Sequence, residues 1–396
     1  MGRPVPDDRE YTVSIVQCPD YELHAVREAV QSCVKNIGGF GAFVRSGSRV
    51  LIKPNLLSAH PPGDAVTTHP SVLRAVIELV QDAGGCPVVG DSPGGRNTQA
   101  SYRALLKVTG VQTVLDETGC PSVYFDAATI GIPAPDALTF KRFTVPKICT
   151  EVDAVITLPK LKTHQLTTFT GAVKLLYGYL PGILKAEYHL HAGMDVDQFA
   201  DLLLDIAVTL PPTLSVMDGI VGMEGNGPSH GSPRTAGVVF ASTSSMALDM
   251  VACRLIGFDN PFPPTVRRAA ERGIGPGSLD QVRCAGATPA DLGIGDWKRP
   301  DAPLYRHIPR PILTVARRVF AARPKVDTTA CTRCGICALN CPSGAIRVSS
   351  ARAPVISAQR CICCYCCQEL CPSGAIRISQ PLLRRMLGSI PEGRKV

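Results

Sequence analysis

Short apolar runs alternate with segments of helical periodicity through the first 300 residues. Within 68–82, a Thr-His-Pro start signal is followed by Val72, Val76 and Leu79 at helical spacing. Apolar runs such as 154–158 have the length of buried strands. The alternation predicts an α/β fold in which a mostly parallel sheet carries helices on both faces. The expected strands are 50–52, 87–90, 154–158, 214–217 and 238–241, and the expected helices are 68–82, 194–210 and 246–256.

Polar side chains gather just after the ends of these predicted strands. They are Lys53, Asn55, Asp91, Lys160, Lys162, His164, Asp218, Glu224 and Asn226. In open α/β sheets, ligands bind beyond the carboxyl ends of the strands, where loops reach out from a rigid base. We therefore expect these residues to form a substrate or cofactor site at that edge.

The densest polar stretch is 158–191, which holds four lysines, three histidines and a single acidic residue. The basic residues are Lys160, Lys162, His164, Lys174, Lys185, His189 and His191. Their charge favours an anionic substrate or cofactor, and we predict that Lys185 helps to bind it. We predict catalytic roles for His164, Lys174 and His189, since histidine exchanges protons near neutral pH. A solvated basic loop is the alternative, and the many apolar neighbours count against it.

A second stretch, 218–234, holds five glycines and could cradle a phosphate with its backbone N–H groups. It lacks the residue order of a P-loop, and no G-x-G-x-x-G motif opens a helix. Neither nucleotide fingerprint is therefore supported. Asp218 and Glu224 are candidates for metal binding or acid–base chemistry, and stabilising the turn is an equal alternative.

Near the C-terminus, two cysteine motifs of identical spacing lie thirty residues apart. Each reads C-x2-C-x2-C-x3-C-P, and 341–347 and 371–377 share the string CPSGAIR. In two-cluster bacterial ferredoxins, each motif gives three ligands to one cluster and its fourth to the other. We predict two [4Fe-4S] clusters on this pattern. One would be held by Cys331, Cys334, Cys337 and Cys371, and the other by Cys361, Cys364, Cys367 and Cys341.

Cys363 and Cys366 also lie inside the second motif, but they break its spacing. We interpret them as packing thiols or as influences on the cluster potential. Zinc is the main alternative for the whole array, yet it needs neither a tandem repeat nor the prolines that follow. A disulfide framework is disfavoured in a chain of this length that opens with no secretory signal.

Charge divides the chain into two parts. From residue 301 onward there are fifteen Lys/Arg against four Asp/Glu, a net +11, whereas the preceding residues carry −3. Basic residues would offset the negative charge of the clusters, and some could form a docking face for an acidic electron donor. We predict an α/β domain at 1–300, a basic linker helix at 301–324, a small ferredoxin-like α+β domain at 325–380 and a basic tail at 381–396.

The same patterns set the expected partners and location. No apolar stretch approaches the ~18 residues that span a membrane, so no integral membrane segment is expected. The basic part shows no nucleic-acid motif and no interleaved aromatics, so nucleic acid is not an expected partner. We expect a small anionic substrate, a redox partner such as a ferredoxin, flavodoxin or reductase, and a cytoplasmic location.

Several segments between residues 50 and 257 together resemble the DUF362 family. They are LIKPNLL, TTHPSVLRAV, VVGDSPGG, LPKLKTH, TGAVK and MDGIVGMEGNGP. Members of that family are often fused to a ferredoxin domain, which is the arrangement expected here. The resemblance implies no settled reaction, and the fusion to electron-transfer clusters indicates a reductase or another redox enzyme.

Residues 164–191 are also similar to the active-site segment of the nickel-pincer lactate racemase family. That segment has a histidine, a lysine ten residues later, a Pro-Gly turn and a later histidine, and His164, Lys174 and His189 or His191 follow this order. The resemblance implies that Lys174 would hold the pincer nucleotide and that the later histidine would bind nickel. Thr-Gly-Ala-Val stands here where that family has a Gly-Gly pair.

Three functions stay open on the sequence. The first is an iron–sulfur oxidoreductase that passes electrons from its clusters to a substrate in the α/β domain. The second is a non-catalytic electron-transfer subunit. The third is a racemase or epimerase with a pincer-type cofactor. The oxidoreductase is favoured by the size of the first 300 residues and by their many polar side chains at predicted strand ends, because an electron carrier needs only the cysteine-rich part.

Overall fold

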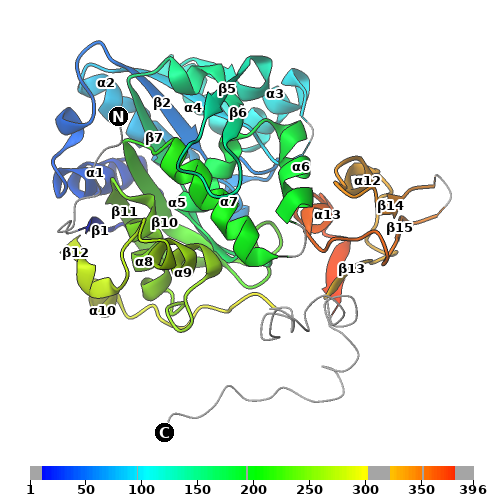
Figure 1. Cartoon of the computed structure of the whole chain (residues 1–396). Coiled ribbons are helices and arrows are strands. Elements are labelled where there is room, and N and C mark those ends of the chain that lie inside the picture. The colour runs from blue at the N-terminus through cyan, green and yellow to red at the C-terminus, as the bar shows by residue number, and fades with distance from the viewer. Residues whose placement is uncertain (1–10, 96, 193–194, 302–321, 350–351, 380–396) are drawn as a thin grey trace, which may run out of the picture. The chain divides into compact units, whose positions relative to one another are not determined.

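The computed structural model describes residues 11–95, 97–192, 195–301, 322–349 and 352–379. The chain forms two compact units, 1–185 with 196–300 and 186–195 with 301–396. The first unit is built on a ten-stranded mixed sheet (Figure 1), and the second contains small antiparallel sheets. The α/β fold class and the small second part are therefore confirmed, whereas the domain boundaries stay a prediction.

Neighbouring strands of the large sheet are mostly parallel. The strand order is β12 (Val282–Gly286), β1 (Tyr11–Gln17), β11 (Ser232–Ser242), β10 (Leu214–Glu224), β7 (Ala154–Leu158), β2 (Arg49–Pro54), β3 (Cys86–Asp91) and β4 (Ser122–Tyr124). Parallel pairing joins β10 to β7, β7 to β2, β2 to β3 and β3 to β4, whereas β11 is antiparallel to β10 and β1. In a short branch of the sheet, β8 (Lys160–His164) pairs with β10 and with β9 (Thr168–Thr170).

Helices cover both faces of this sheet, as Figure 1 shows. The side chains of β11 alternate, so that Val239 and Ala241 enter one core and Val238 and Phe240 enter the other. The first core is completed by α1 (Leu23–Lys35), α2 (Pro70–Asp82), α3 (Gln99–Val108) and α4 (Val111–Thr118). The second is completed by α5 (Ala172–Leu175), α8 (Ser245–Leu255) and α9 (Pro264–Glu271).

Further elements complete the described part of the first unit. They are α7 (Val196–Thr209) and the shorter β5 (Thr129–Pro133), β6 (Arg142–Pro146), α10 (Pro289–Leu292), and the 3-10 helices η1 (Phe40–Ala42), η2 (Pro62–Asp64), η3 (Phe125–Ala127), η4 (Lys147–Thr150), η5 (Leu176–Tyr179) and η6 (Leu279–Gln281). The division between the two units falls within α6 (Gly182–Ala192).

The expected phosphate loop at 218–234 is wrong in its extent. β10 continues to Glu224 and β11 begins at Ser232, so only 225–231 connects the two strands. The glycines serve close packing, because a Cβ on Gly222 would collide with the ring of Trp297. The other predicted strands and helices are present with ends shifted by a few residues, and 154–158 coincides with β7.

The second unit repeats one backbone pattern around its two cysteine motifs. Left-handed residues recur at matching positions, Arg333 with Cys363, Gly335 with Tyr365 and Gly344 with Gly374. Two antiparallel pairs enclose the motifs. The elements are β13 (Arg323–Val326) with β16 (Ile376–Ser379), β14 (Ile346–Arg347) with β15 (Val355–Ile356), and the one-turn helices α12 (Ile336–Leu339) and α13 (Cys366–Glu369).

The predicted basic linker helix at 301–324 falls largely outside the described residues, and the predicted tail at 381–396 lies wholly outside them. Within the described ranges, no helix combines the length and apolar character needed to cross a membrane.

Candidate functional site

The predicted site edge lies where the order of strands reverses. From β2 the chain continues to β3 on one side, and it later returns to form β7 on the other side of β2. The carboxyl ends of β2 and β7 are therefore adjacent at a point where the connecting segments diverge. Lys53 lies at the end of β2 and Asn55 follows this strand, and Lys160 follows β7.

A buried ion pair joins the ends of β2 and β3. Lys53 Nζ lies 2.5 Å from Asp91 Oδ1, and both side chains are buried. Asp91 also accepts hydrogen bonds from the backbone N–H groups of Leu56 and Ser92, each at 2.9 Å. A Cβ on Gly178 would come within 2.6 Å of the same carboxylate, so η5 packs directly over the pair.

A second buried ion pair joins the beginning of β8 to β10. Lys160 Nζ lies 2.7 Å from Asp218 Oδ2, and neither side chain is exposed. The Tyr21 hydroxyl donates to Asp218 Oδ1 at 2.8 Å and accepts from Lys160 Nζ at 2.8 Å. Burial lowers the pKa of Lys160, and the carboxylate opposes that shift. The three groups form one closed hydrogen-bonded centre, which we call the Lys160 centre.

The ring of His69 stacks on Tyr21 beside this centre, with ring centroids 3.6 Å apart and planes at 13°. His69 is the N-cap of α2, and its Nδ1 accepts from the backbone N–H of Ser71 at 3.2 Å. Its neutral form therefore carries the proton on Nε2. Burial lowers the pKa of His69 to about 4. Among the described residues, nothing accepts a hydrogen bond from Nε2, so a neutral donor is left beside the Lys160 centre.

The segment 66–69 ties the strand ends together. The Thr68 hydroxyl accepts from the backbone N–H of Asn55 at 2.9 Å and donates to the carbonyl of Leu158 at 2.6 Å. Lys162 Nζ donates to the carbonyl of Val66 at 2.5 Å. Bonds from β7, from β8 and from the residue after β2 thus meet on Val66 and Thr68, which fixes the backbone that leads into His69.

Lys185 is fully engaged by the loop after β3. Its ammonium donates to the carbonyl of Ser92 at 2.5 Å, the hydroxyl of Ser92 at 3.0 Å and the carbonyl of Pro93 at 2.9 Å. These are all three donors that a lysine has. Burial lowers the pKa of Lys185 to about 8. In this arrangement the side chain fastens α6 to the loop and has no donor left for a ligand.

Two of the three predicted catalytic residues, His164 and Lys174, lie on short elements of the first unit, and His189 is buried on α6. His164 is wholly buried at the end of β8, where its Nδ1 accepts from the backbone N–H groups of Leu166 at 3.0 Å and Thr167 at 3.3 Å. The following Thr168 has a left-handed φ of 68°, which is strained for a β-branched residue. Lys174 is half-buried on α5.

A buried carboxylate fixes the beginning of α5. Asp249 accepts from the backbone N–H groups of Ala172 at 2.6 Å and Val173 at 3.0 Å. Burial raises the pKa of Asp249 to about 7, although these two hydrogen bonds oppose the rise. Gly171 allows the approach, because a Cβ there would overlap the carboxylate. Asp249 therefore positions the turn that carries Lys174.

The eight motif cysteines of the second unit line two separate cavities. Nowhere in the described ranges do three His, Cys, Asp or Glu side chains converge on one point suited to a single metal ion. Each cavity instead has four thiols around its wall. Cys331, Cys334, Cys337 and Cys371 line the first cavity, and Cys341, Cys361, Cys364 and Cys367 line the second.

The surroundings of the thiols are mainly apolar, with a few hydrogen-bond donors. The backbone N–H of Ala345 donates to Cys341 Sγ at 3.2 Å, and the hydroxyls of Ser343 and Ser373 lie 3.7 Å from Cys341 and Cys371. The two remaining thiols of the second motif, Cys363 and Cys366, are absent from both cavity walls. Four thiolates and N–H···S contacts suit an iron–sulfur cluster, so the residues present fit the predicted group.

Comparison with known proteins assigns the family. Residues 50–254 match the family described as "Domain of unknown function (DUF362)". The chain belongs to the DUF362 family. A relative from Synechocystis sp. (strain ATCC 27184 / PCC 6803 / Kazusa), described as "Thylakoid-associated protein sll1697", is 35% identical over 311 residues, which cover 78% of this chain and 94% of the relative.

The second unit of this DUF362 protein has its own match. Residues 324–347 match the family described as "4Fe-4S binding domain", which supports an iron–sulfur group and electron transfer. Among solved structures, the lactate racemase apoprotein from Thermoanaerobacterium thermosaccharolyticum has a TM-score of 0.43 and 11% identity, and the match covers 65% of this chain and 60% of that one. The pincer-type roles of Lys174 and His189 stay a prediction.

Residues 158–191 were also open to interpretation as a solvated basic loop, and the burial of most of their lysines and histidines in this DUF362 protein speaks against it. Lys160, Lys162 and His164 are each at most 1% exposed, and Lys185 is also buried. Glu224 has partners of its own: it lies 2.8 Å from an Arg234 guanidinium nitrogen and accepts from the backbone N–H of Lys298. It closes the β10–β11 hairpin, and Asn226 lies in the same turn.

Sequence reasoning missed Tyr21 and His69. Tyr21 follows β1, a strand that the apolar pattern did not predict. His69 stood in the sequence as part of a helix start signal, and its place just before α2 was read only as a boundary. The position of His69 could have identified it. A histidine at the start of the helix that follows β2 is expected at the same edge of the sheet as Lys53.

Proposed function

We propose that this DUF362 protein is an iron–sulfur oxidoreductase. Its C-terminal ferredoxin-like domain would hold two [4Fe-4S] clusters, and its α/β domain would bind a small anionic substrate that receives the electrons. The proposal rests mainly on the walls of the two cavities. Each wall combines the first three thiols of one cysteine motif with the fourth thiol of the other motif. Bound clusters would supply single electrons.

Two motifs of identical spacing, each with three thiols on one cavity and the fourth on the other, favour two clusters over zinc. A zinc site needs four ligands around a single ion and no second motif. The 4Fe-4S family match covers only the first motif, so the second cluster rests on the repeat and on the matching cavity.

The Lys160 centre supports substrate binding at the carboxyl ends of the strands. Lys160 and Lys162 place two buried ammonium groups there, the first of them opposite Asp218, and the N-terminus of α2 adds positive potential. His69 would donate its Nε2–H to a substrate oxygen while staying neutral, which a pKa of about 4 allows at physiological pH. His164, Lys174 and His189 stay candidates for proton transfer on the sequence argument.

A non-catalytic electron-transfer subunit is the second candidate. The observation in its favour is that Lys53 and Lys160 each already have a carboxylate partner. Internal ion pairs of this kind can exist for structure alone. The relative is described as thylakoid-associated, so the cytoplasmic location also stays a prediction, which cell fractionation would test.

One experiment separates the two candidates. The protein is photoreduced without oxygen and mixed with a panel of 2-oxo acids and enoates, and reoxidation is followed by visible absorbance. The oxidoreductase proposal predicts that at least one compound reoxidises the wild type, and that Lys160→Met slows this step about tenfold or more. Equal reoxidation of both proteins by every compound would favour the carrier.

A further inference from the structure

The two cysteine cavities differ in their access to solvent. Cys334, on the wall of the first cavity, is the one exposed thiol of the eight. In the second cavity, Cys364 and Cys367 are buried and the other two thiols are half-buried. A partner protein can therefore come closest to the first cavity, beside Cys334.

Exposed apolar side chains lie close in the chain to residues that line this cavity. Ile336 and Pro354 line it, Leu339 lies one turn after Ile336 on α12, and Val355 follows Pro354 on β15. Leu339 is 57% exposed, Val355 67% and the neighbouring Val348 53%. Large apolar side chains that stay in water around a redox site are typical of the core of a transient interface.

The charge around these apolar residues has one sign. Residues 322–379 contain seven Lys/Arg and two Asp/Glu. Of the two acids, Asp327 is half-buried and lies 2.9 Å from Arg377, and Glu369 is buried. Arg347 is exposed and is the register partner of Val355 on β14, and Arg333 is exposed on the cavity wall. The surface is thus complementary to an acidic protein.

We propose that a face made of Arg333, Cys334, Leu339, Arg347 and Val355, the entry face, docks a small acidic electron-transfer protein that delivers electrons beside Cys334. The proposal rests on the proposed function, because it needs a cluster in the first cavity. One electron leaves the reduced partner, which becomes oxidised, and enters the group held by Cys331, Cys334, Cys337 and Cys371.

A membrane surface fits this face less well than a protein does. Interfacial membrane binding relies on an amphipathic helix with a long apolar face, and α12 has only four residues. The pairing of Arg347 with Val355 on a short hairpin instead gives a compact patch of mixed character, which suits the apolar centre and charged rim of a protein partner.

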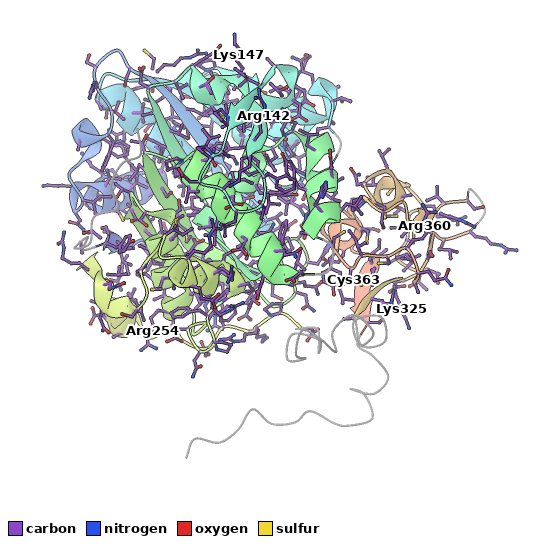
Figure 2. The ribbon with its side chains drawn as sticks, viewed as in Figure 1. Arg142, Lys147, Arg254, Lys325, Arg360 and Cys363 are labelled. Carbon is purple, nitrogen blue, oxygen red and sulfur yellow. The ribbon has the colours of Figure 1, made fainter. Side chains whose placement is uncertain are left out.

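The test uses the full-length anaerobic protein and a reduced acidic [2Fe-2S] ferredoxin as the probe. Arg347→Glu and Val355→Ser are compared with the wild type, and Arg254→Glu on α8 is the matched charge control. Figure 2 labels Arg254 in the first unit, as well as Arg360 and Lys325 at the surface of the second. Complex formation is measured by biolayer interferometry, and electron transfer by stopped-flow absorbance.

We expect added salt to weaken binding to the wild type, Arg347→Glu to slow electron transfer about tenfold, and Arg254→Glu to change neither. Dithionite should reduce all four proteins equally, because a small reductant needs no docking.

Binding that is insensitive to both substitutions and to salt would overturn the entry face. A membrane would replace the protein partner if the wild type binds anionic vesicles in a flotation assay, Arg347→Glu does not, and Arg347→Glu shows no slowing of electron transfer. Failure of dithionite to reduce the wild type would instead refute the proposed function.

Discussion

At the scale of single residues, the first unit is unusual in burying four lysines, Lys53, Lys160, Lys162 and Lys185. Two of them face carboxylates at 2.5 and 2.7 Å, and the other two donate to backbone carbonyls. An ammonium group loses its hydration on burial, so each needs such partners. The sequence marked these residues as a group, yet burial could not be predicted, because it depends on the segments that cover them.

The buried Lys160–Asp218 pair gives the first prediction. Lys160→Met leaves Asp218 charged and buried, and we expect a loss of about 3–5 kcal/mol of unfolding free energy. Trp297 is the only tryptophan of the chain and is buried in the first unit, so its fluorescence in urea reports this transition. The exposed pair of Arg27 with Asp82 is the control, and Arg27→Ala should cost less than about 1 kcal/mol. Equal losses in the two variants would contradict the account.

The protonation state of His69 gives the second prediction. Its pKa falls from an ordinary 6.5 to about 4 in the folded protein because of burial. Between these values the unfolded chain takes up a proton that folded His69 does not, so this residue makes unfolding easier as pH falls through that window. Imidazole ¹⁵N NMR, assigned by the signal lost in His69→Gln, should show a neutral Nε2–H ring at pH 6. A ring that is half protonated at that pH would refute the prediction.

At the scale of elements, the sequence predicted those strands and helices whose apolar side chains follow a regular spacing. Strand 154–158 and helix 246–256 were found almost to the residue, because a run of apolar side chains decides their burial. The stretch 218–234 was misjudged since its glycines were read as a flexible loop. They are needed where β10 packs against Trp297 and Val238, and those contacts form only in the folded sheet. β8 was missed for a related reason, since its polar residues pair beside β10.

Helix α5 depends on a close contact between Gly171 and Asp249. Gly171→Ala would force its new methyl group against the capping carboxylate, and we expect a loss of about 1–3 kcal/mol of unfolding free energy. Gly41→Ala is the matched control, because nothing lies within 4 Å of a Cβ there and its φ is ordinary. Urea unfolding followed by Trp297 fluorescence measures both. A neutral Gly171→Ala would show that Asp249 does not hold α5 in place.

At the scale of the whole molecule, a polar α/β unit is combined with a cysteine-rich unit. The spacing predicted the sets of four thiols that line the two cavities, because each motif brings three thiols close together and the repeat supplies the fourth, whereas the bound clusters stay a prediction. The chemistry of the first unit could not be predicted in the same way. Its site is assembled from residues as distant in sequence as Tyr21 and Asp218, and no local pattern records that contact.

The crossed arrangement of thiols gives a prediction for the second unit. Cys371 belongs to the second motif but lines the cavity of the first. Cys371→Ser should therefore disrupt the cluster of the first motif and leave the other in place, which halves the iron content. Cys363→Ser should keep both clusters, because Cys363 lies on neither cavity wall. Anaerobic iron analysis with electron paramagnetic resonance of the reduced proteins measures both outcomes. Loss of both clusters in Cys363→Ser would contradict the assignment.

Native mass spectrometry of the anaerobically purified, full-length protein tests most directly whether the chain holds two clusters. We expect the mass of the chain plus two [4Fe-4S] clusters, since four cysteines line each of two cavities. Zinc in place of iron, or a single cluster, would contradict the two-cluster assignment and the oxidoreductase proposal that rests on it.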